Sequence, residues 1–377
     1  MTDIGYMQKA IELAACGSGW VNPNPLVGAV IVKDGCIVGE GFHERFGQPH
    51  AEQNAIAAAG NKVEGSTLYV TLEPCCHFGK TPPCTETIIE RKIAKVVVGS
   101  LDPNPQVAGK GILRLQEAGI EVISGFMKQE CDQLNRIFFH YIQTKTPYVL
   151  MKYAMTLDGK IATCTGASKW ITGEEARQDV HKLRGRYAAI MVGIGTVLAD
   201  DPLLNCRVEG GHSPLRIVCD SRLSIPLESQ IVQTASQQAT VIATTKTSAF
   251  HNTEKAALLE EAGCTVLAVP PSVATDASGE NRIDLKHLMA ALGERAIDSV
   301  LIEGGSALHG AALNANIVNA VRCYIAPKLF GGHNAPSPVG GLGFELPENA
   351  PCLERVTMEQ FGEDFCFEGE FPRSEVK

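Results

Sequence analysis

The chain has 377 residues, which exceeds one typical domain, so we expect two domains. Hydrophobic residues at 45% and charged residues at 20% are typical of an ordinary soluble globular protein. A formal net charge of −9 argues against a nucleic-acid partner, and no apolar run is long enough to span a membrane.

Cysteine usage and the N-terminus indicate the compartment. Met1, Thr2 and Asp3 do not begin a basic segment followed by an apolar one, so a secretory signal is not expected. Thirteen cysteines scattered through such a chain are typical of reduced thiols rather than of a disulfide framework. We therefore expect a cytoplasmic protein.

Helices and strands alternate in the N-terminal half. Apolar residues at helical spacing predict a helix over 7–15. Two apolar runs, 26–32 and 36–40, flank Asp34 and Gly35 and predict a hairpin, because Asp-Gly supplies the positive φ angles of its turn. Further helices are expected over 51–59, 84–92 and 109–118, and further strands over 67–72, 95–99 and 120–124. This alternation predicts a layered α/β domain.

The first candidate site lies where three of these elements begin or end. His50 precedes a predicted helix, and Glu52 lies in the first turn of that helix. Cys75 follows a predicted strand, and Cys84 begins the next helix. One imidazole and two thiolates can hold a zinc ion and leave its fourth position for water. Glu52, which is not needed as a ligand, is then free to move protons between that water and a leaving amine.

A His-x-Glu segment followed by Pro-Cys and a second cysteine is typical of the zinc-dependent nucleobase deaminases. Two residues usually separate those cysteines, whereas Cys84 lies much further from Cys75. This departure argues against a generic cytidine deaminase. Cys76 or His77 could supply a fourth ligand and make the zinc site structural, but a closed structural site would have no need of Glu52.

From His50 to Cys84 the sequence closely resembles the pyrimidine deaminase of riboflavin biosynthesis, whose loop has this longer form. Residues 22–28, Asn-Pro-Asn-Pro-Leu-Val-Gly, match the PNPxVG segment of that family. The resemblance implies a cytidine-deaminase-like α/β/α domain with one Zn²⁺ per chain, held by His50, Cys75 and Cys84. It also implies substrate contacts at Asn24, His43 and Lys80, with Lys80 near the phosphate and Asp102 in the lining of the site.

The second half of the chain predicts another α/β domain. A polar segment that ends at Pro147 marks the expected boundary and divides the chain into 1–146 and 147–377. A helix is expected over 174–184, and the small, polar residues 272–280 predict a surface loop. Strands are expected over 148–154, 188–192, 215–219, 240–244, 265–269, 299–302 and 320–325. Helices between several of these strands predict a mostly parallel sheet.

Two glycine elements, at 193–195 and 304–306, stand where predicted strands of this half end. Glycine lets a backbone approach phosphate closely and offers amide donors at the start of a helix. The first element is not the dinucleotide fingerprint, because Leu198 stands where its third glycine belongs. Taken alone, each element is equally typical of a tight turn.

The C-terminal half resembles the reductase half of the same bifunctional riboflavin enzymes, which has a dihydrofolate-reductase-like fold. The matching segments are 151–152, 157–162, 168–173, 181–184, 192–196, 200–204, Arg207 and 303–305. The resemblance implies that NADPH contacts Ala154, Trp170, Thr196, Asp200, Ser221 and Gly305. It implies that the substrate contacts Ser168, Arg184, Leu204, Arg207 and Glu303.

Four charged residues suit this chemistry. Arg184 and Arg207 can hold a ribose 5-phosphate through forked hydrogen bonds. Lys152 and Glu303 can protonate or stabilise the opened ribose as hydride arrives. Each residue also has an ordinary interpretation, since arginines are common on solvated surfaces and a lysine with a glutamate can form a structural ion pair.

The resemblance of both halves implies a bifunctional enzyme of riboflavin biosynthesis. We expect the first domain to deaminate 2,5-diamino-6-(ribosylamino)-4(3H)-pyrimidinone 5′-phosphate. We expect the second to reduce the product, 5-amino-6-(5-phosphoribosylamino)uracil, to its ribitylamino form with NADPH. The alternatives are a nucleic-acid base deaminase with an appended domain and a non-catalytic, zinc-stabilised binding protein. The expected partner is a small phosphorylated pyrimidine, without nucleic acid or membrane, and we expect a homo-oligomer.

Overall fold

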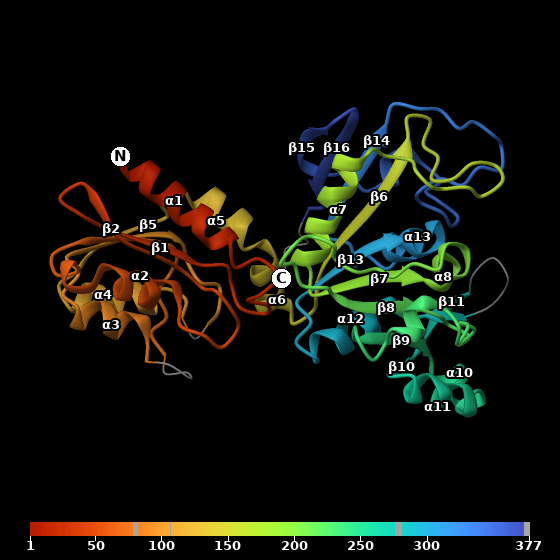
Figure 1. Ribbon diagram of the computed structural model, residues 1–377, viewed down its shortest axis with the longest axis horizontal. Coiled ribbons are helices and arrows are strands. Elements are labelled where there is room, and N and C mark those ends of the chain that lie inside the picture. The colour runs from red at the N-terminus through yellow and green to blue at the C-terminus, as the bar shows by residue number, and fades with distance from the viewer. Residues whose placement is uncertain (78–81, 106, 276–280, 373–377) are drawn as a thin grey trace. The chain divides into compact units, whose positions relative to one another are not determined.

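The chain folds into two compact units, Met1–Lys145 and Thr146–Lys377, each built around its own sheet (Figure 1). The computed structural model describes residues 1–77, 82–105, 107–275 and 281–372. Among these residues, no helix is both long and apolar enough to cross a membrane. Each unit is described by itself below.

A five-stranded sheet with the order β2-β1-β3-β4-β5 forms the centre of the first unit. Its strands are β1 (Gly28–Lys33), β2 (Cys36–Phe42), β3 (Thr67–Leu72), β4 (Lys95–Ser100) and β5 (Glu121–Ser124). β1 pairs antiparallel with β2 and with β3, whereas β3, β4 and β5 are parallel. Asp34 and Gly35 join β1 to β2 with φ angles of 50° and 75°, which confirms the predicted hairpin.

Helices cover both faces of this sheet, which confirms the predicted α/β/α layering. α1 (Asp3–Ala15) and α5 (Lys128–Leu134) lie on one face, above the sheet in Figure 1. α2 (Ala51–Ala59), α3 (Cys84–Glu90) and α4 (Lys110–Glu117) lie on the other. Neighbouring residues of a strand point to opposite faces of the sheet. Val30 therefore packs in the core beneath α1, and Ile31 packs in the core beneath α2. The sequence did not predict α5 or the following α6 (Arg136–Thr144).

The second unit contains a nine-stranded sheet with the order β10-β9-β8-β7-β13-β6-β14-β16-β15. All neighbours from β10 to β14 are parallel, and β16 and β15 continue the sheet in antiparallel pairing. The strands are β6 (Tyr148–Thr156), β7 (Ala189–Gly193), β8 (Leu215–Cys219), β9 (Thr240–Thr245), β10 (Thr265–Val269), β13 (Ser299–Gly304), β14 (Ala320–Ala326), β15 (Glu354–Phe361) and β16 (Asp364–Glu370). The predicted, mostly parallel sheet is therefore present, and β15 and β16 are additions to it.

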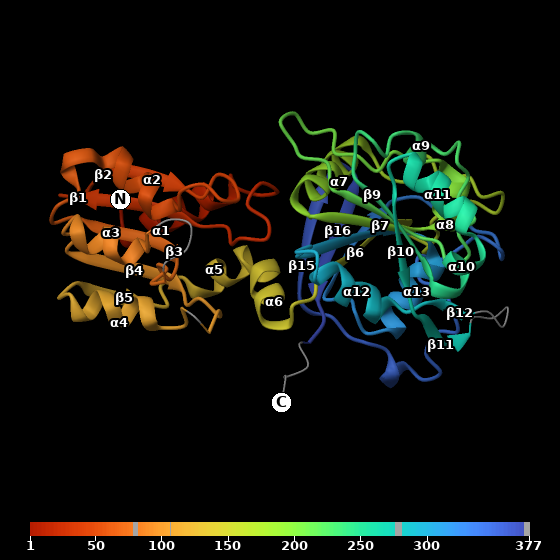
Figure 2. The same cartoon turned by 90° about the horizontal axis from the view of Figure 1, so that it is seen from below.

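Helices again pack on both faces of the sheet (Figure 2). One core contains residues of α12 (Leu285–Gly293) and α13 (Ser306–Asn314). The other contains residues of α8 (Ile194–Asp200), α9 (Gln230–Gln233) and α11 (Thr253–Glu261). α7 (Glu174–Arg186) packs near β14 and β16 through Ala176, Tyr324 and Cys366, and α10 (Lys246–His251) follows β9.

One sequence-based expectation is wrong in part. The polar residues 272–280 were expected to form a surface loop, but those as far as Thr275 belong to β11 (Pro271–Thr275). This strand pairs antiparallel with β12 (Asn281–Ile283), so backbone hydrogen bonds to a partner strand outweigh the low apolar content. Residues 276–280 lie outside the described part of the chain.

Candidate active sites

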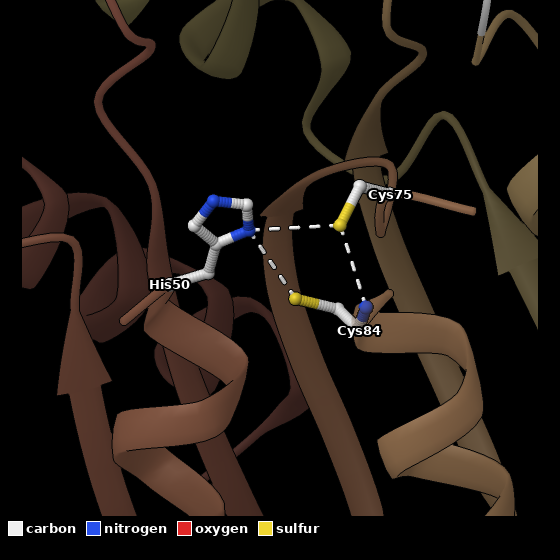
Figure 3. A group of neighbouring side chains, drawn as sticks. All are labelled: His50, Cys75 and Cys84. Atoms are coloured by element: carbon white, nitrogen blue, oxygen red, sulfur yellow. Dashed lines mark hydrogen bonds between the residues drawn. The ribbon is translucent and has the colours of Figure 1, made fainter. Parts of the chain in front are cut away.

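His50, Cys75 and Cys84 converge at one end of the first unit's sheet (Figure 3). His50 is the N-cap residue of α2, Cys84 is the first residue of α3, and Cys75 follows β3. His50 Nδ1 lies 3.6 Å from Cys75 Sγ and 3.4 Å from Cys84 Sγ. The ligand atoms of the three residues all lie within 4.8 Å of one another, as the sequence predicted for a metal site.

The donor set and its spacing fit zinc. Tetrahedral zinc with ordinary bond lengths to sulfur and nitrogen places those two ligand atoms roughly 3.5 Å apart. Hydrogen bonding from Cys84, together with His50, lowers the pKa of Cys75, so its thiolate is available. Among the residues that the structure describes, Cys76 and His77 do not join the group, and His77 is exposed. A closed, four-ligand structural site therefore has no support there.

Glu52 lies in the first turn of α2 and is only 3% exposed. Burial raises the pKa of this carboxyl group, and the charge of His50 opposes the rise. A buried carboxyl group beside a metal site can accept and return a proton without competing solvent. Glu52 therefore has the position and environment of a general acid–base.

Asn24 and His43 meet beside His50. Asn24 Nδ2 lies 3.1 Å from His43 Nε2, and His43 Nδ1 lies 3.1 Å from the Pro49 carbonyl oxygen. Burial lowers the pKa of His43, so a neutral ring donates to Pro49 and accepts from Asn24. The two rings of His43 and His50 are 5.4 Å apart, edge to face. Asn135 holds the Asn24 loop in place, because its side chain pairs with both backbone groups of Leu26 at 2.8 Å.

Glu73, two residues before Cys75, organises a stretch of backbone through its carboxylate. Its Oε1 accepts from the backbone N–H groups of Gly111 and Ile112, and its Oε2 accepts from those of Gly109 and Asp102. The carboxylate thereby satisfies donors at the start of α4 that have no partner within the helix. Burial, reinforced by the charge of Glu73, raises the pKa of Asp102 to about 6. Lys80, the expected phosphate contact, lies outside the described residues.

The second site centres on a buried ion cluster. Glu303, at the end of β13, receives two hydrogen bonds from Arg184 of α7, at 2.7 Å from Nε and 2.8 Å from Nη2. Lys152 of β6 donates to the same carboxylate at 3.3 Å. Burial alone would raise the pKa of Glu303, but the charges of Arg184 and Lys152 outweigh it and lower the pKa to about 2. Glu303 is therefore ionised.

Asn205 connects the two arginines that the sequence assigned to phosphate binding. Its backbone carbonyl accepts from Arg184 Nη1 at 3.2 Å, and its side-chain oxygen accepts from Arg207 Nε at 3.3 Å. Leu204, the preceding residue, is buried and adopts a left-handed φ of 53°. The loop after α8 thus holds Arg207 near Arg184, because both arginines donate to Asn205. Two further donors of Arg184 are hydrogen-bonded to Glu303.

Expected cofactor contacts gather at the carboxyl ends of the parallel strands, where open α/β sheets bind ligands. Thr196, in α8 after β7, lies against the turn that follows β13. A Cβ atom added at Gly304 would lie 3.1 Å from Thr196 Oγ1, and Gly305 has a φ of 87°. This closely packed turn leads into α13, whose free N–H groups suit a phosphate of NADPH.

The remaining predicted contacts lie around this edge. Ser168 Oγ donates to Asp200 Oδ1 at 3.3 Å, which joins an expected substrate contact to an expected cofactor contact. Trp170 is 65% exposed, with the Arg177 guanidinium 4.6 Å from its ring centroid. Ala154 lies near the end of β6, and Ser221 follows β8, where its hydroxyl accepts from the N–H of Ile283.

The comparisons with known proteins agree with both halves. Residues 1–100 match the cytidine and deoxycytidylate deaminase zinc-binding region, and residues 147–367 match the RibD C-terminal domain. Riboflavin biosynthesis protein RibD of Actinobacillus pleuropneumoniae is 54% identical over 97% of this chain and 94% of its own. RibD of Escherichia coli (strain K12) is 40% identical over 97% of this chain and 98% of its own. The solved deaminase/reductase of Thermotoga maritima has a TM-score of 0.84 at 39% identity over 98% of each chain.

The fold and the two sites define a two-domain enzyme that joins a zinc-dependent deaminase to an NADPH-dependent reductase. The chain belongs to the RibD family of riboflavin biosynthesis proteins. It is accordingly a hydrolase and an oxidoreductase that acts on a small pyrimidine substrate, as the sequence predicted. Membership of this family overturns the alternatives of a nucleic-acid deaminase and a non-catalytic binding protein.

Proposed function

We propose that His50, Cys75 and Cys84 hold the zinc ion of the deaminase and that Glu52 is its general acid–base. The observation that carries this proposal is the buried Glu52 carboxyl group beside three ligands that lack a fourth protein ligand among the described residues. Zinc, when bound there, supplies a water activated at neutral pH. Glu52 takes the proton of that water and returns it to the departing amino group of the pyrimidine.

In this domain the substrate is contacted by Asn24, His43 and Lys80, and Asp102 lines the site. The neutral His43, fixed by Asn24 and Pro49, lies beside the ring of His50 and limits the space for the pyrimidine. Lys80 supplies a positive charge for the ribose 5-phosphate. Deamination of the diaminopyrimidine phosphate then gives the substrate of the second domain.

In the reductase domain, Lys152 is the proton donor and Glu303 is its anchor. Glu303 has no proton to give near neutral pH, because its pKa is lowered to about 2. Its carboxylate instead holds the Lys152 ammonium and the Arg184 guanidinium in fixed positions. NADPH, when bound, supplies the hydride that reduces carbon 1 of the opened ribose. Lys152 then delivers a proton to the adjacent heteroatom.

The other predicted residues divide between cofactor and substrate. Arg207 and Arg184 bind the substrate phosphate, and Ser168, Leu204 and Glu303 line the substrate side. The cofactor contacts are Ala154, Trp170, Thr196, Asp200, Ser221 and Gly305. The proposed domains are 1–146 for the deaminase and 147–377 for the reductase.

The protein is cytoplasmic, a proposal supported by its 13 free thiols, which suit a reducing compartment.

It also self-associates. Val356 and Met358 of β15 and Phe365 and Phe367 of β16 are 37–64% exposed, and Met358 lies directly opposite Phe367. A shared apolar surface of this kind is typical of an interaction site. Sedimentation of Phe367→Asp should show a smaller species than the unmodified protein, and equal sizes would count against self-association through this surface.

Replacing the proposed acid–base tests the deaminase assignment. Glu52→Gln should retain zinc and the fold, because the amide is nearly isosteric and the residue is not a ligand. Ammonia release should fall by about 100- to 10,000-fold, the usual contribution of a positioned acid–base group. The reciprocal variant Lys152→Met should release ammonia normally and lose NADPH oxidation. Near-normal ammonia release by Glu52→Gln would overturn the role of Glu52.

A further inference from the structure

A third basic side chain faces the two arginines of the reductase site. His181 lies on α7, three residues before Arg184, so both side chains project from the same face of the helix. Arg184 and Arg207 are close enough to His181 to interact with it electrostatically. The Asn205 backbone also contacts the ring, while Asn205 binds both arginines. One loop residue therefore orients three nitrogen-rich side chains.

The ring of His181 has an unsatisfied donor or acceptor. Its Nδ1 is buried and has no hydrogen-bond partner among the residues that the structure describes. Such a buried polar atom costs free energy unless a ligand satisfies it. Three groups face the ring besides the Asn205 backbone: Arg184 on its own helix, Arg207 on the loop after α8, and Glu303 on β13. Cys206 Sγ donates to the backbone carbonyl of His181 at 3.3 Å, which places the loop that carries Arg207 against this turn of α7.

We propose that His181 is a third phosphate ligand of the reductase site and that it takes up a proton when the phosphorylated substrate binds. This inference rests on the proposed phosphate binding by Arg184 and Arg207. An added phosphate dianion lies between three potential cations and can accept a hydrogen bond from the imidazolium. The proton comes from solvent and leaves again with the product, so no other reactant is needed.

The charges around His181 favour uptake of a proton when the phosphorylated substrate binds. Burial lowers the pKa of His181, and the charges of Arg184 and Arg207 lower it further, so the neutral ring is favoured before the substrate binds. A phosphate beside the ring favours its charged form and raises its pKa. Substrate binding is then coupled to proton uptake. The affinity should be highest below the pKa of the unliganded ring, and this gain should be lost as the pH rises through the pKa of the bound state.

Calorimetric titration of the full-length protein measures this coupling. The ligand is 5-amino-6-(5-phosphoribosylamino)uracil without NADPH, so that no turnover occurs, in two buffers with different ionisation enthalpies. The unmodified protein should take up a fraction of a proton that His181→Gln does not take up. His181→Gln should bind about 10- to 100-fold more weakly, the range for a hydrogen bond to a charged group. Its affinity for the dephosphorylated ligand should be unchanged.

Two further variants separate the outcomes. Lys182→Gln removes a charge from the exposed neighbouring position and should match the unmodified protein in both proton uptake and affinity. If Arg207→Ala weakens phosphate binding while His181→Gln does not, the inference about His181 is wrong and the phosphate site stands. If neither variant weakens binding, the proposed phosphate site is wrong as well. Equal proton uptake by the unmodified protein and His181→Gln also overturns the inference.

Discussion

Glu52 and Cys76 mark the difference between a catalytic and a structural zinc site. Cys76 adjoins a ligand in sequence, yet it lies outside the group formed by His50, Cys75 and Cys84 among the described residues. Glu52 is buried beside that group without being one of the three ligands. An open metal position with an adjacent carboxyl group is the arrangement that hydrolytic chemistry requires.

Neighbouring cysteines provide a matched test of the ligand set. Cys75→Ser should lose zinc and ammonia release, because the hydroxyl is a poorer ligand than the thiolate. Cys76→Ser should keep both, since Cys76 is not in the group. NADPH oxidation with the deaminated substrate should continue in either variant. Metal analysis and the two activity assays check this, and full zinc occupancy in Cys75→Ser would contradict the assignment.

The buried Glu303 carboxylate makes the stability of the reductase domain depend on pH. Its pKa is lowered from 4.5 to about 2 in the folded protein, so the folded state binds this proton less tightly than the unfolded state. The resulting stabilisation is complete above pH 4.5 and is lost as the pH falls toward 2. It amounts to about 3 kcal/mol.

Urea unfolding between pH 5 and pH 3 measures this effect. The protein has two tryptophans, Trp20 in the first unit and Trp170 in the second, so Trp20→Phe leaves a reporter in the reductase domain. Glu303→Gln should be less stable at pH 5, because the charges of Lys152 and Arg184 lose their buried partner. Its stability should also fall less steeply with acid than that of the unmodified protein. Parallel pH profiles would contradict the account.

Single elements show which parts of the fold the sequence could predict. The bounds of α2 and β3 agree with the expected ranges, because an alanine-rich run ends at Gly60 and a run rich in apolar and β-branched residues ends before Glu73. The bounds of β8 and β10 also agree with the expected ranges. Each of these elements packs at least one face into a core, and its residues carry a clear pattern.

Other elements and contacts have no such local signal. β15 is almost entirely exposed, and its place in the sheet depends on pairing with β16. Glu303 lies 119 residues from Arg184, so their bidentate pair follows only from the parallel sheet that places α7 beside the end of β13. The sequence likewise gave no indication of the four backbone donors that Glu73 satisfies.

The start of α4 therefore depends on one side chain, that of Glu73, which directly follows β3. Glu73→Ala removes the acceptor for four backbone N–H groups, of which those of Asp102 and Gly111 are buried. We expect the deaminase domain to lose roughly 1.5–3 kcal/mol or more of stability, the range for hydrogen bonds to a charged group. Urea unfolding followed by Trp20 fluorescence in Trp170→Phe checks this value. Glu90→Ala, at an exposed position, is the control and should leave stability unchanged.

At the scale of the whole molecule, each of the two compact units carries the residues for one of the two reactions. Each unit has its own sheet and core, and the proposed catalytic residues of each lie within that unit. The three proposed zinc ligands all belong to the first unit, and Lys152, Glu303 and Arg184 all belong to the second. Variants in one site are therefore expected to leave the other reaction intact.

The central claim is that one chain performs deamination and reduction in sequence, and product masses test it most directly. The purified protein is incubated with the diaminopyrimidine ribosyl phosphate, with and without NADPH. Without NADPH, the product should show replacement of one amino group by oxygen, with release of ammonia. With NADPH, the product should also gain two hydrogens. Unchanged substrate without NADPH, or a product with NADPH that gains no hydrogen, would contradict the account.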